Sequence, residues 1–246
     1  MRRCNVCHDI ADYSLYETVL DKDQCQRDIL VCPSCNVLYN ETLEQQNFTS
    51  SEIENFQRAA VQGVYHISDD ELARIGTRVA ESEPIISFLF EQNEIPLNRG
   101  TYLEVGAGAG YLAAAAARSF TNIFTIELDS REIKKTFDAM NVASAKVMSN
   151  INEFSRVGAS ADLIVLWHTL EHIQNPLEFL KDLKRALSRT GVIYFQVPLY
   201  RRQNVFPAHI WFFNARTIGV LRERLGFNKQ KIVFDTTNDF MTVMYW

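Results

Sequence analysis

Residues 103–112 read Leu103-Glu-Val-Gly-Ala-Gly-Ala-Gly-Tyr-Leu112. This pattern predicts a buried strand, then a turn carrying Gly106, Gly108 and Gly110, then the start of a helix. Glycines let the backbone turn sharply and approach a ligand closely, and the start of a helix presents free N–H groups. The spacing is Gly-x-Gly-x-Gly, whereas the dinucleotide-binding pattern is Gly-x-Gly-x-x-Gly. By itself the turn therefore indicates either a nucleotide-type cofactor or a tight structural turn.

Short apolar runs alternate with helical stretches from Gly100 to Trp246. Near-continuous apolar strands in such an alternation predict a buried parallel sheet. The predicted fold class is α/β, with a Rossmann-like seven-stranded, mostly parallel sheet and helices on both faces. The predicted strands are Thr101–Val105, Asn122–Glu127, Ala145–Met148, Ala161–Trp167, Gly191–Val197, Lys229–Asp235 and Met241–Trp246. The predicted helices are Tyr111–Ser119, Ser130–Met140, Ile151–Phe154, Pro176–Leu187 and Asn214–Leu225.

The polar segment before this sheet has helical periodicity in two places. Glu52–Val64 is predicted as one helix. Asp69–Glu91 is predicted as a second helix, because Ser68-Asp-Asp-Glu71 forms a capping sequence and apolar residues follow at helical spacing. We expect Pro84 to kink or divide this helix.

All five cysteines lie in the first 35 residues. Four of them form two Cys-x-x-Cys pairs, Cys4/Cys7 and Cys32/Cys35, and two such turns can complete a tetrahedron of thiolates around Zn²⁺. Disulfides are the alternative, and a cytoplasmic chain argues against them. The remaining Cys25 is predicted to be a small buried hydrophobe, with Cys25 or His8 as the alternative for one ligand.

Four protein ligands leave no position for a substrate, so this zinc is predicted to be structural. The sheet domain is thus expected to be preceded by a small zinc-binding module. The predicted division is a zinc-binding module (1–45), a helical linker or lid (46–98) and the sheet domain (99–246).

Two acidic residues narrow the choice of cofactor. Glu104 lies two residues before Gly106, where a carboxylate would repel a pyrophosphate but suit an ammonium or sulfonium group. Glu127 ends the second predicted strand about 20 residues beyond the glycines, where an acidic group can bind two ribose hydroxyls. A cationic amino-acid ligand with an unphosphorylated ribose describes S-adenosylmethionine.

Residues from about 100 to 246 resemble a class I S-adenosylmethionine-dependent methyltransferase. The matching stretches are the glycine turn, Ile126-Glu-Leu-Asp129, Ala161–Trp167, Leu170-Glu-His172 with Asn175-Pro176, and Leu187–Gly191 before Val197-Pro198. The resemblance implies that Glu104, Gly106, Gly108 and Gly110 hold the methionine moiety, Glu127 the ribose, and Asn150 and Ile151 the adenine, with Leu128 and Trp167 in the same site. The cysteine module is similar to the zinc-binding N-terminus of some methyltransferases of deoxysugar and polysaccharide pathways.

The acceptor side is predicted from histidines. Trp167-His-Thr-Leu-Glu-His172 follows the fourth predicted strand, and the active site of an open parallel sheet lies beyond the carboxyl ends of its strands. We expect His168, His172 and His209 to converge there with Glu171. His172 resembles the general base of sugar methyltransferases that carry a Glu-His pair, and a histidine can take a hydroxyl proton at neutral pH. Structural packing of the Glu-His pair is the alternative.

A catalytic divalent metal is a further alternative for these residues. Some relatives hold Mg²⁺ or Mn²⁺ with Glu-x-x-Glu-His and a distant histidine. Here His168 replaces the first glutamate, which favours a transition metal. Arg201 and Arg202 suit the diphosphate of a nucleotide-sugar, or else form a solvated pair.

Composition limits the classes of partner. With 25 basic and 30 acidic residues among 246 and a formal net charge of -5, the chain is a poor candidate for nucleic-acid binding. No apolar run approaches the roughly 20 residues of a membrane span, and no secretory signal is visible, so we expect a cytoplasmic protein.

The predicted function is methyl transfer to a small-molecule acceptor, with a sugar or sugar-containing metabolite such as a nucleotide-sugar or glycan favoured. O-methylation is favoured over C-methylation. The alternatives are an RNA or protein methyltransferase docked through the zinc module, and a non-catalytic S-adenosylmethionine-binding protein. The sequence does not set the oligomeric state.

Overall fold

The computed structural model describes residues 1–21, 24–41, 66–94 and 96–246, so the predicted helix Glu52–Val64 lies outside the described residues. The chain forms two compact units. The first unit comprises Met1–Ile53, His168–Lys184 and Phe195–Trp246, and the second comprises Glu54–Trp167 and Arg185–Tyr194. Each unit combines segments that are distant in sequence. The units do not test the predicted boundaries of the zinc-binding module near residue 45 and of the sheet domain near residue 98, so these boundaries stay predictions.

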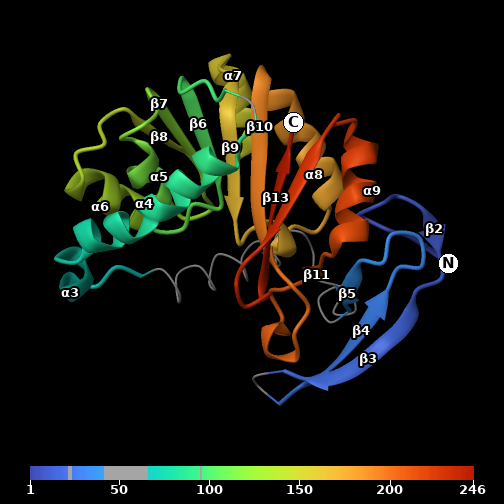
Figure 1. Cartoon of the computed structure of the whole chain (residues 1–246). Coiled ribbons are helices and arrows are strands. Elements are labelled where there is room, and N and C mark those ends of the chain that lie inside the picture. Colours follow the sequence, from blue (N-terminus) through green and yellow to red (C-terminus); the bar gives the residue numbers. More distant parts are fainter. Residues whose placement is uncertain (22–23, 42–65, 95) are drawn as a thin grey trace. The chain divides into compact units, whose positions relative to one another are not determined.

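The second unit contains the parallel strands β6 to β9, which lie side by side in Figure 1. Their bounds are Thr101–Val105 (β6), Asn122–Ile126 (β7), Ala145–Met148 (β8) and Ala161–Trp167 (β9). β6 pairs in parallel with both β7 and β9, and β7 pairs in parallel with β8. All residues of β6 are buried, as expected for a strand in the middle of a parallel sheet.

The complete sheet has seven strands in the order β12-β13-β10-β9-β6-β7-β8. β10 (Leu187–Pro198) begins in the second unit and ends in the first, which also contains β12 (Gln230–Phe234) and β13 (Phe240–Tyr245). β12 and β13 pair antiparallel. The predicted seven-stranded, mostly parallel Rossmann-like sheet is confirmed. β10 is longer than predicted at its start, because it begins at Leu187, directly after the preceding helix ends at Ala186.

Among its described residues, the second unit contains the helices α3 (Asp69–Leu72), α4 (Ile75–Gln92), α5 (Tyr111–Ala116), α6 (Ser130–Ala139) and α7 (Ile151–Val157). α4 packs on α5, and α5 packs on β6 and β7 (Figure 1). In the described part of the chain, no helix is both long and apolar enough to cross a membrane.

The segment predicted as one helix over 69–91 forms two helices, and Pro84 is not the point of division. The capping box at Ser68 and Glu71 starts α3, with the Ser68 Oγ accepting from Glu71 N and the Glu71 carboxylate accepting from Ser68 N. The break falls at Ala73 and Arg74, and α4 continues through Pro84. Proline inside a helix costs about 3 kcal/mol. Four buried apolar side chains on one face of α4 offset this cost, at roughly 1.5–3 kcal/mol each: Ile75, Val79, Ile86 and Leu89.

The first unit contains a four-stranded antiparallel sheet in the order β11-β5-β4-β3. Its strands are β3 (Ser14–Leu20), β4 (Gln26–Val31), β5 (Leu38–Asn40) and β11 (Trp211–Phe212), beside a small pair β1 (Arg2–Arg3) and β2 (Ile10–Ala11). Most of α8 (Pro176–Ala186), together with α9 (Ala215–Leu225) and the short 3₁₀ helices η1 (Leu170–His172) and η2 (Arg202–Asn204), completes the unit.

The N-terminal cysteine segment and the C-terminal part of the chain share a core. Val19, Ile29 and Leu38 pack there with Val205 and Phe212. Since a core joins the two stretches, the N-terminal residues are an integral part of the first unit.

Cys25 differs from its prediction, because the structure places it on the surface. It lies in the turn between β3 and β4, where its N–H donates to Oδ1 of Asp21 and its carbonyl accepts from Asp21 N. A hairpin end of this kind projects from the sheet and gives the side chain no core to enter.

Candidate functional site

The glycine turn joins β6 to α5, and its three glycines have a left-handed backbone. The φ angles are 71° at Gly106, 54° at Gly108 and 79° at Gly110, values that glycine adopts without strain. A Cβ atom on Gly110 would lie 2.3 Å from Cγ1 of Ile133 in α6. Both the conformation and the close approach of α6 therefore require glycine at Gly110.

Glu127 ties the glycine turn to the end of β7. One carboxylate oxygen accepts from Gly108 N at 2.7 Å, and the other accepts from Leu128 N at 2.7 Å. The side chain is buried, and burial raises its pKa despite these hydrogen bonds. The structure thus brings the predicted methionine and ribose residues together at the carboxyl ends of two adjacent strands.

Glu104 is buried on β6 beside Tyr102, whose hydroxyl donates to Oε2 of Glu104 at 3.2 Å. Burial raises the pKa of Glu104 to about 8, with Glu127 contributing a smaller repulsion. A cationic ligand would restore the charged form, because an opposite charge favours ionisation. Tyr102 was not among the residues predicted for this site. Its position two residues before Glu104 was the available signal, since alternate residues of a strand share a face.

The predicted adenine residues follow β8. Asn150 is the exposed N-cap of α7, where its Oδ1 accepts from Glu153 N and its Nδ2 donates to the Ser149 hydroxyl. Ile151 is buried as the first residue of α7. Glu127 N donates to the carbonyl of Met148, so the ends of β7 and β8 lie together. Trp167 is the half-buried last residue of β9.

Four cysteines converge in the first unit, and all four are buried. The Sγ atoms of Cys4 and Cys35 are 4.0 Å apart, and those of Cys7 and Cys32 are 3.9 Å apart. A disulfide requires about 2.05 Å, whereas four thiolates around Zn²⁺ at about 2.3 Å stand about 3.8 Å apart. The arrangement fits a tetrahedral zinc ion and excludes the disulfide alternative for these pairs.

The two Cys-x-x-Cys turns have the same backbone geometry. His8 and Asn36 follow the second cysteine of each pair with φ of 65° and 62°. His8 N donates to the Cys4 carbonyl and Asn36 N donates to the Cys32 carbonyl, each at 2.8 Å. The His8 ring lies beside Arg3 and Glu178, so the group of side chains that could hold a metal ion contains the four cysteines and neither His8 nor Cys25.

A second cluster in the first unit contains Glu171, His172 and His209. Nε2 of His172 and Nε2 of His209 each lie 3.9 Å from the same Glu171 oxygen, Oε1. The two imidazole rings are 5.0 Å apart between centroids. Three of the four residues predicted for the acceptor side therefore form a compact group.

Backbone carbonyls orient both imidazoles. Nδ1 of His172 lies 2.6 Å from the carbonyl oxygen of Ala208, and Nδ1 of His209 lies 2.8 Å from that of Asn204. A carbonyl only accepts, so each Nδ1 carries a proton and, in the neutral ring, each Nε2 carries a lone pair. The two basic nitrogens therefore face Glu171.

Glu171 is fully buried in η1. Among the described residues, neither of its carboxylate oxygens has a hydrogen-bond partner. Burial raises the pKa of Glu171 to about 8 and lowers that of His172. A buried carboxylate without hydrogen bonds is expensive to ionise, so the group is suited to a bound cation or to the protonated form.

His168 lies beside Glu171 but does not belong to the group formed by Glu171, His172 and His209, whose ligand atoms all lie close to one another. Its Nδ1 is 3.8 Å from Oε1 of Glu171, and its ring packs edge-on against Phe240 with centroids 4.8 Å apart. Its φ is 53°, an uncommon conformation for a residue other than glycine. Burial lowers its pKa to about 4, so it is neutral at pH 7.

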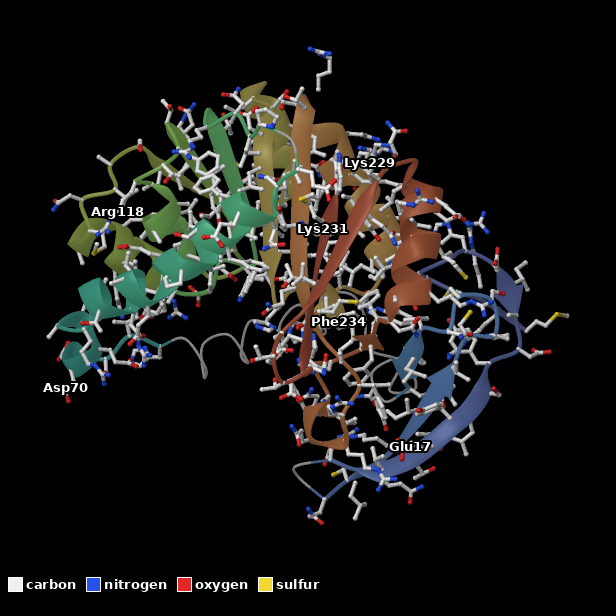
Figure 2. The ribbon with its side chains drawn as sticks, viewed as in Figure 1. Glu17, Asp70, Arg118, Lys229, Lys231 and Phe234 are labelled. Atoms are coloured by element: carbon white, nitrogen blue, oxygen red, sulfur yellow. The ribbon has the colours of Figure 1, made fainter. Side chains whose placement is uncertain are left out.

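The two arginines after β10 have acidic partners. Arg202 pairs with Glu17 of β3 at 2.7 Å, and Arg201 lies 3.6 Å from Asp239 (Figure 2 labels Glu17). Tyr200 also donates to Glu17. These pairings favour a structural role for the arginines over a site for a diphosphate.

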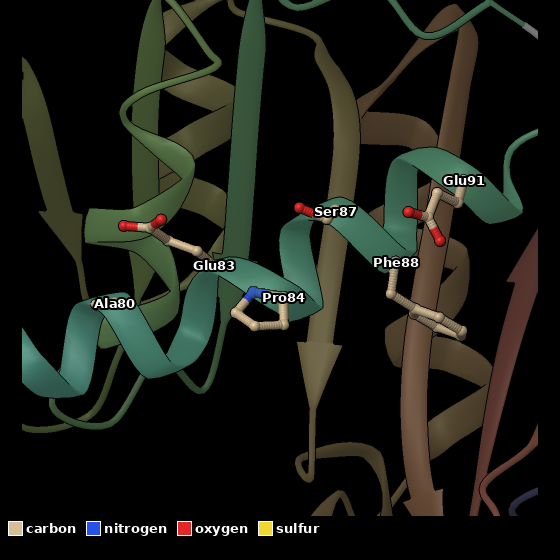
Figure 3. Close-up of a pocket in the computed structure, with 6 residues that line it drawn as sticks. All are labelled: Ala80, Glu83, Pro84, Ser87, Phe88 and Glu91. Atoms are coloured by element: carbon tan, nitrogen blue, oxygen red, sulfur yellow. The ribbon is translucent and has the colours of Figure 1, made fainter.

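A shallow hollow on α4 does not carry a site. Its lining residues are Ala80, Glu83, Pro84, Ser87, Phe88 and Glu91, and all of them come from this one helix (Figure 3). Arg118 neutralises Glu83. A surface formed from one side only cannot enclose a ligand.

Comparison with known proteins identifies the class. Residues 70–232 match the model of a family described as a methyltransferase domain, and the chain belongs to this family. The protein is an S-adenosylmethionine-dependent methyltransferase. No curated protein matches the sequence.

Solved structures share the fold at low identity. The DhpI complex with SAH is 15% identical, with a TM-score of 0.54 over 80% of this chain and 98% of that chain. A SAM-dependent methyltransferase from Aquifex aeolicus is 16% identical, with a TM-score of 0.52 over 81% and 98%. The mitomycin 7-O-methyltransferase MmcR is 13% identical, with a TM-score of 0.54 over 69% and 53%.

Proposed function

We propose that this methyltransferase methylates a hydroxyl group of a small molecule, with a sugar or sugar-containing metabolite as the favoured acceptor. The observation that carries the proposal is His172. Its Nδ1 donates to a backbone carbonyl, so that Nε2 is available as a base. S-adenosylmethionine, when bound, supplies an electrophilic methyl group. The chain has to hold the cofactor, orient the acceptor and remove its proton.

The cofactor is assigned to the second unit. Glu104 would bind the ammonium group, and the glycine turn would lie against the methionine moiety. Glu127 would accept hydrogen bonds from the ribose hydroxyls. Its carboxylate already accepts backbone N–H groups, but an ionised carboxylate offers about four lone-pair positions. Leu128, Asn150, Ile151 and Trp167 complete the proposed site.

His172 is assigned as the general base. It takes the hydroxyl proton at Nε2 while Nδ1–H stays bonded to Ala208. Burial lowers the pKa of His172, which favours the neutral ring that can accept a proton. Glu171 lies 3.9 Å away, and its ionised form would stabilise the imidazolium that forms. His168 and His209 would line the same acceptor region.

Oxygen is favoured as the acceptor atom because a histidine base suits a hydroxyl group. A structure with the same fold, MmcR, is named as an O-methyltransferase. The sugar preference rests on the similarity of the cysteine module to the zinc-binding N-termini of sugar-pathway methyltransferases.

A structural Zn²⁺ at Cys4, Cys7, Cys32 and Cys35 is part of the proposal. The sulfur–sulfur distances and the four-cysteine donor set support it. A hydrogen bond with the Cys35 thiol lowers the pKa of Cys4, and burial raises that of Cys7. A bound Zn²⁺ would hold all four sulfurs as thiolates.

A divalent transition metal at Glu171, His172 and His209 is a second candidate. One observation favours it: both oxygens of a fully buried carboxylate lack hydrogen bonds within the described residues. The three ligand atoms lie within 4.8 Å of one another. Ligands of a tetrahedral zinc ion are about 3.4 Å apart at bond lengths near 2.1 Å, so a modest contraction would close the site.

Methyl transfer from labelled cofactor tests the proposal. The acceptor panel contains nucleotide-sugars, glycans, RNA and peptides. The proposal expects label on a sugar hydroxyl. Label on RNA or peptide supports the docking alternative, and cofactor binding without transfer to any acceptor supports a non-catalytic role. Metal analysis distinguishes a general base from a metal site in the histidine cluster. One metal ion per chain fits the general base. Two metal ions per chain, together with activity abolished by chelators, fit the metal site.

A further inference from the structure

We propose that Asn40 is a positioning residue that sets the orientation of both His172 and His209, so that the cysteine module forms part of the acceptor site. This inference rests on the proposed function for the meaning of the two histidines. The contact geometry behind it involves only residues of the first unit.

Asn40 ends β5 and is 1% exposed. Its backbone N–H donates to the carbonyl of Ile210 at 2.9 Å. Its side-chain Nδ2 donates to the carbonyls of Phe206 and His209, both at 3.1 Å. The two side-chain bonds use both N–H groups of the amide, and they join one buried side chain to two separate points of a single turn.

That turn is Phe206-Pro207-Ala208-His209. His209 N donates to the carbonyl of Phe206 at 3.0 Å, and proline in the second position suits a β-turn. Asn40 therefore binds the carbonyls of the first and last residues of the turn. A turn held at both ends has little freedom to rotate its peptide groups, including the one that carries the Ala208 carbonyl.

The same turn controls both imidazoles. Its third residue, Ala208, supplies the carbonyl that accepts from Nδ1 of His172, and its fourth residue is His209 itself. Immediately after the turn, Ile210 N donates to the backbone carbonyl of Glu171 at 2.9 Å. All three members of the cluster are thus connected to the one segment that Asn40 fixes.

The position of Asn40 depends on the cysteine cluster. Cys32 N donates to the carbonyl of Val37, which directs the chain from the second Cys-x-x-Cys turn into β5. The Thr217 hydroxyl of α9 donates to the carbonyl of Cys35, and Nδ2 of Asn214 donates to the carbonyl of Asn36. These bonds fix the cysteine turn, so the cluster is expected to determine where Asn40 stands.

The test uses Asn40→Asp in the full-length protein. This change keeps the size of the side chain but replaces two donated hydrogen bonds with repulsion between oxygens. Asn5→Asp is the matched control. Asn5 also belongs to the cysteine module and donates to one backbone carbonyl, that of Gln174, but that bond does not reach the turn.

The readout is the tautomer of each histidine, measured by ¹⁵N NMR on the imidazole nitrogens without cofactor or acceptor. The native protein and Asn5→Asp should show His172 and His209 protonated at Nδ1. Asn40→Asp should show mixed tautomers for both residues. Its zinc content and affinity for S-adenosylhomocysteine should stay native, and turnover with an acceptor should fall about 10- to 100-fold with little change in KM.

Native tautomers and native turnover in Asn40→Asp would overturn the proposal. Where that variant does not fold, Asn40→Ala removes both donors without adding a charge. Where neither folds, Asn40→Ser replaces the two donors with one on a shorter side chain, and native tautomers of both histidines there would equally overturn it. A third outcome is that the tautomers shift in Asn40→Asp while His172→Ala keeps native turnover. This outcome would refute His172 as the general base but leave the positioning role of Asn40 intact. Failure of the proposed function and failure of this inference are therefore distinguishable.

Discussion

The residues proposed for the cofactor site in the second unit and those proposed for the acceptor site in the first unit are distributed differently along the chain. In the second unit, Glu104, the three glycines and Glu127 lie in one strand–turn–helix–strand segment, joined by backbone hydrogen bonds such as that from Gly108 N to Glu127. In the first unit, Asn40, His172 and His209 come from three separate stretches of chain. The proposed cofactor site is therefore specified locally, whereas the proposed acceptor site depends on long-range packing and, in our proposal, on the cysteine cluster.

Loss of the metal should produce the largest difference between the responses of the two units. Cys32→Ser should lose the Zn²⁺ and make the N-terminal 41 residues accessible to proteases, because a structural zinc contributes about 10–16 kcal/mol of apparent binding energy. Affinity for S-adenosylhomocysteine should be retained, since its assigned residues lie in the second unit. Elemental analysis, limited proteolysis and calorimetry measure the three properties.

Cys25→Ser is the control for this experiment, because Cys25 is exposed and outside the cluster. It should keep one zinc per chain. Metal retained by Cys32→Ser, or cofactor affinity lost together with the metal, would contradict the comparison between the units.

Removal of the proposed base should affect turnover only. His172→Ala is expected to lower the rate of methyl transfer by about 10²–10⁴-fold, the usual contribution of a positioned base, with native cofactor affinity. The native rate should rise with pH through a pKa below the ordinary histidine value, because burial lowers that pKa and only the neutral ring accepts a proton. This rise should vanish in the variant.

His66→Ala is the control for the base, since His66 is an exposed histidine of the second unit. Native turnover in folded His172→Ala would exclude both the base and the metal for this residue. Equal losses in His172→Ala and His209→Ala, with activity restored by added metal after chelation, would favour the metal.

Cofactor affinity should depend on pH through Glu104. Its pKa is about 8 in the free protein, so the carboxyl is protonated at lower pH and must ionise to pair with an ammonium group. Affinity should therefore fall as the pH falls below about 8, by up to about tenfold per pH unit between pH 7.5 and 6. Calorimetry with S-adenosylhomocysteine measures this slope. Glu104→Gln should bind weakly and with a flat pH profile; an unchanged slope would remove Glu104 from the ammonium site.

Loss of the Glu127 carboxylate, which is proposed to bind the ribose, should have the smallest effect of the four predicted changes. Glu127→Ala removes the proposed ribose contacts and the brace on Gly108 and Leu128. Charge-assisted hydrogen bonds contribute roughly 1.5–3 kcal/mol, so affinity should weaken about tenfold or more. Glu127→Gln retains one acceptor oxygen, so its cofactor affinity should lie between those of the native protein and Glu127→Ala. Unchanged affinity in Glu127→Ala would sink the ribose assignment.

Local patterns in the sequence predicted most of the second unit. The bounds of β6, β8 and β9 agree with the prediction, as does the capping box at Ser68. Strand alternation and cap chemistry act over a few residues, so they can be read without the fold. The prediction that Pro84 divides the helix was wrong, because burial along α4, which the sequence does not display, outweighs the local penalty of proline. The alternative, a kink at Pro84, stays a prediction.

By itself, the sequence determined the parallel α/β sheet, the glycine turn, the two acidic residues beside it and the pairing of the cysteines. These features depend on spacing, on backbone conformation and on apolar alternation. Only the tertiary structure decided that the cysteine segment shares a core with residues near 205–212, that His168 lies beside the cluster, and that Asn40 holds the turn of His209. The physical reason is that hydrogen bonds between residues more than 160 positions apart leave no periodic trace in the chain, and they exist only once the core has brought their partners together.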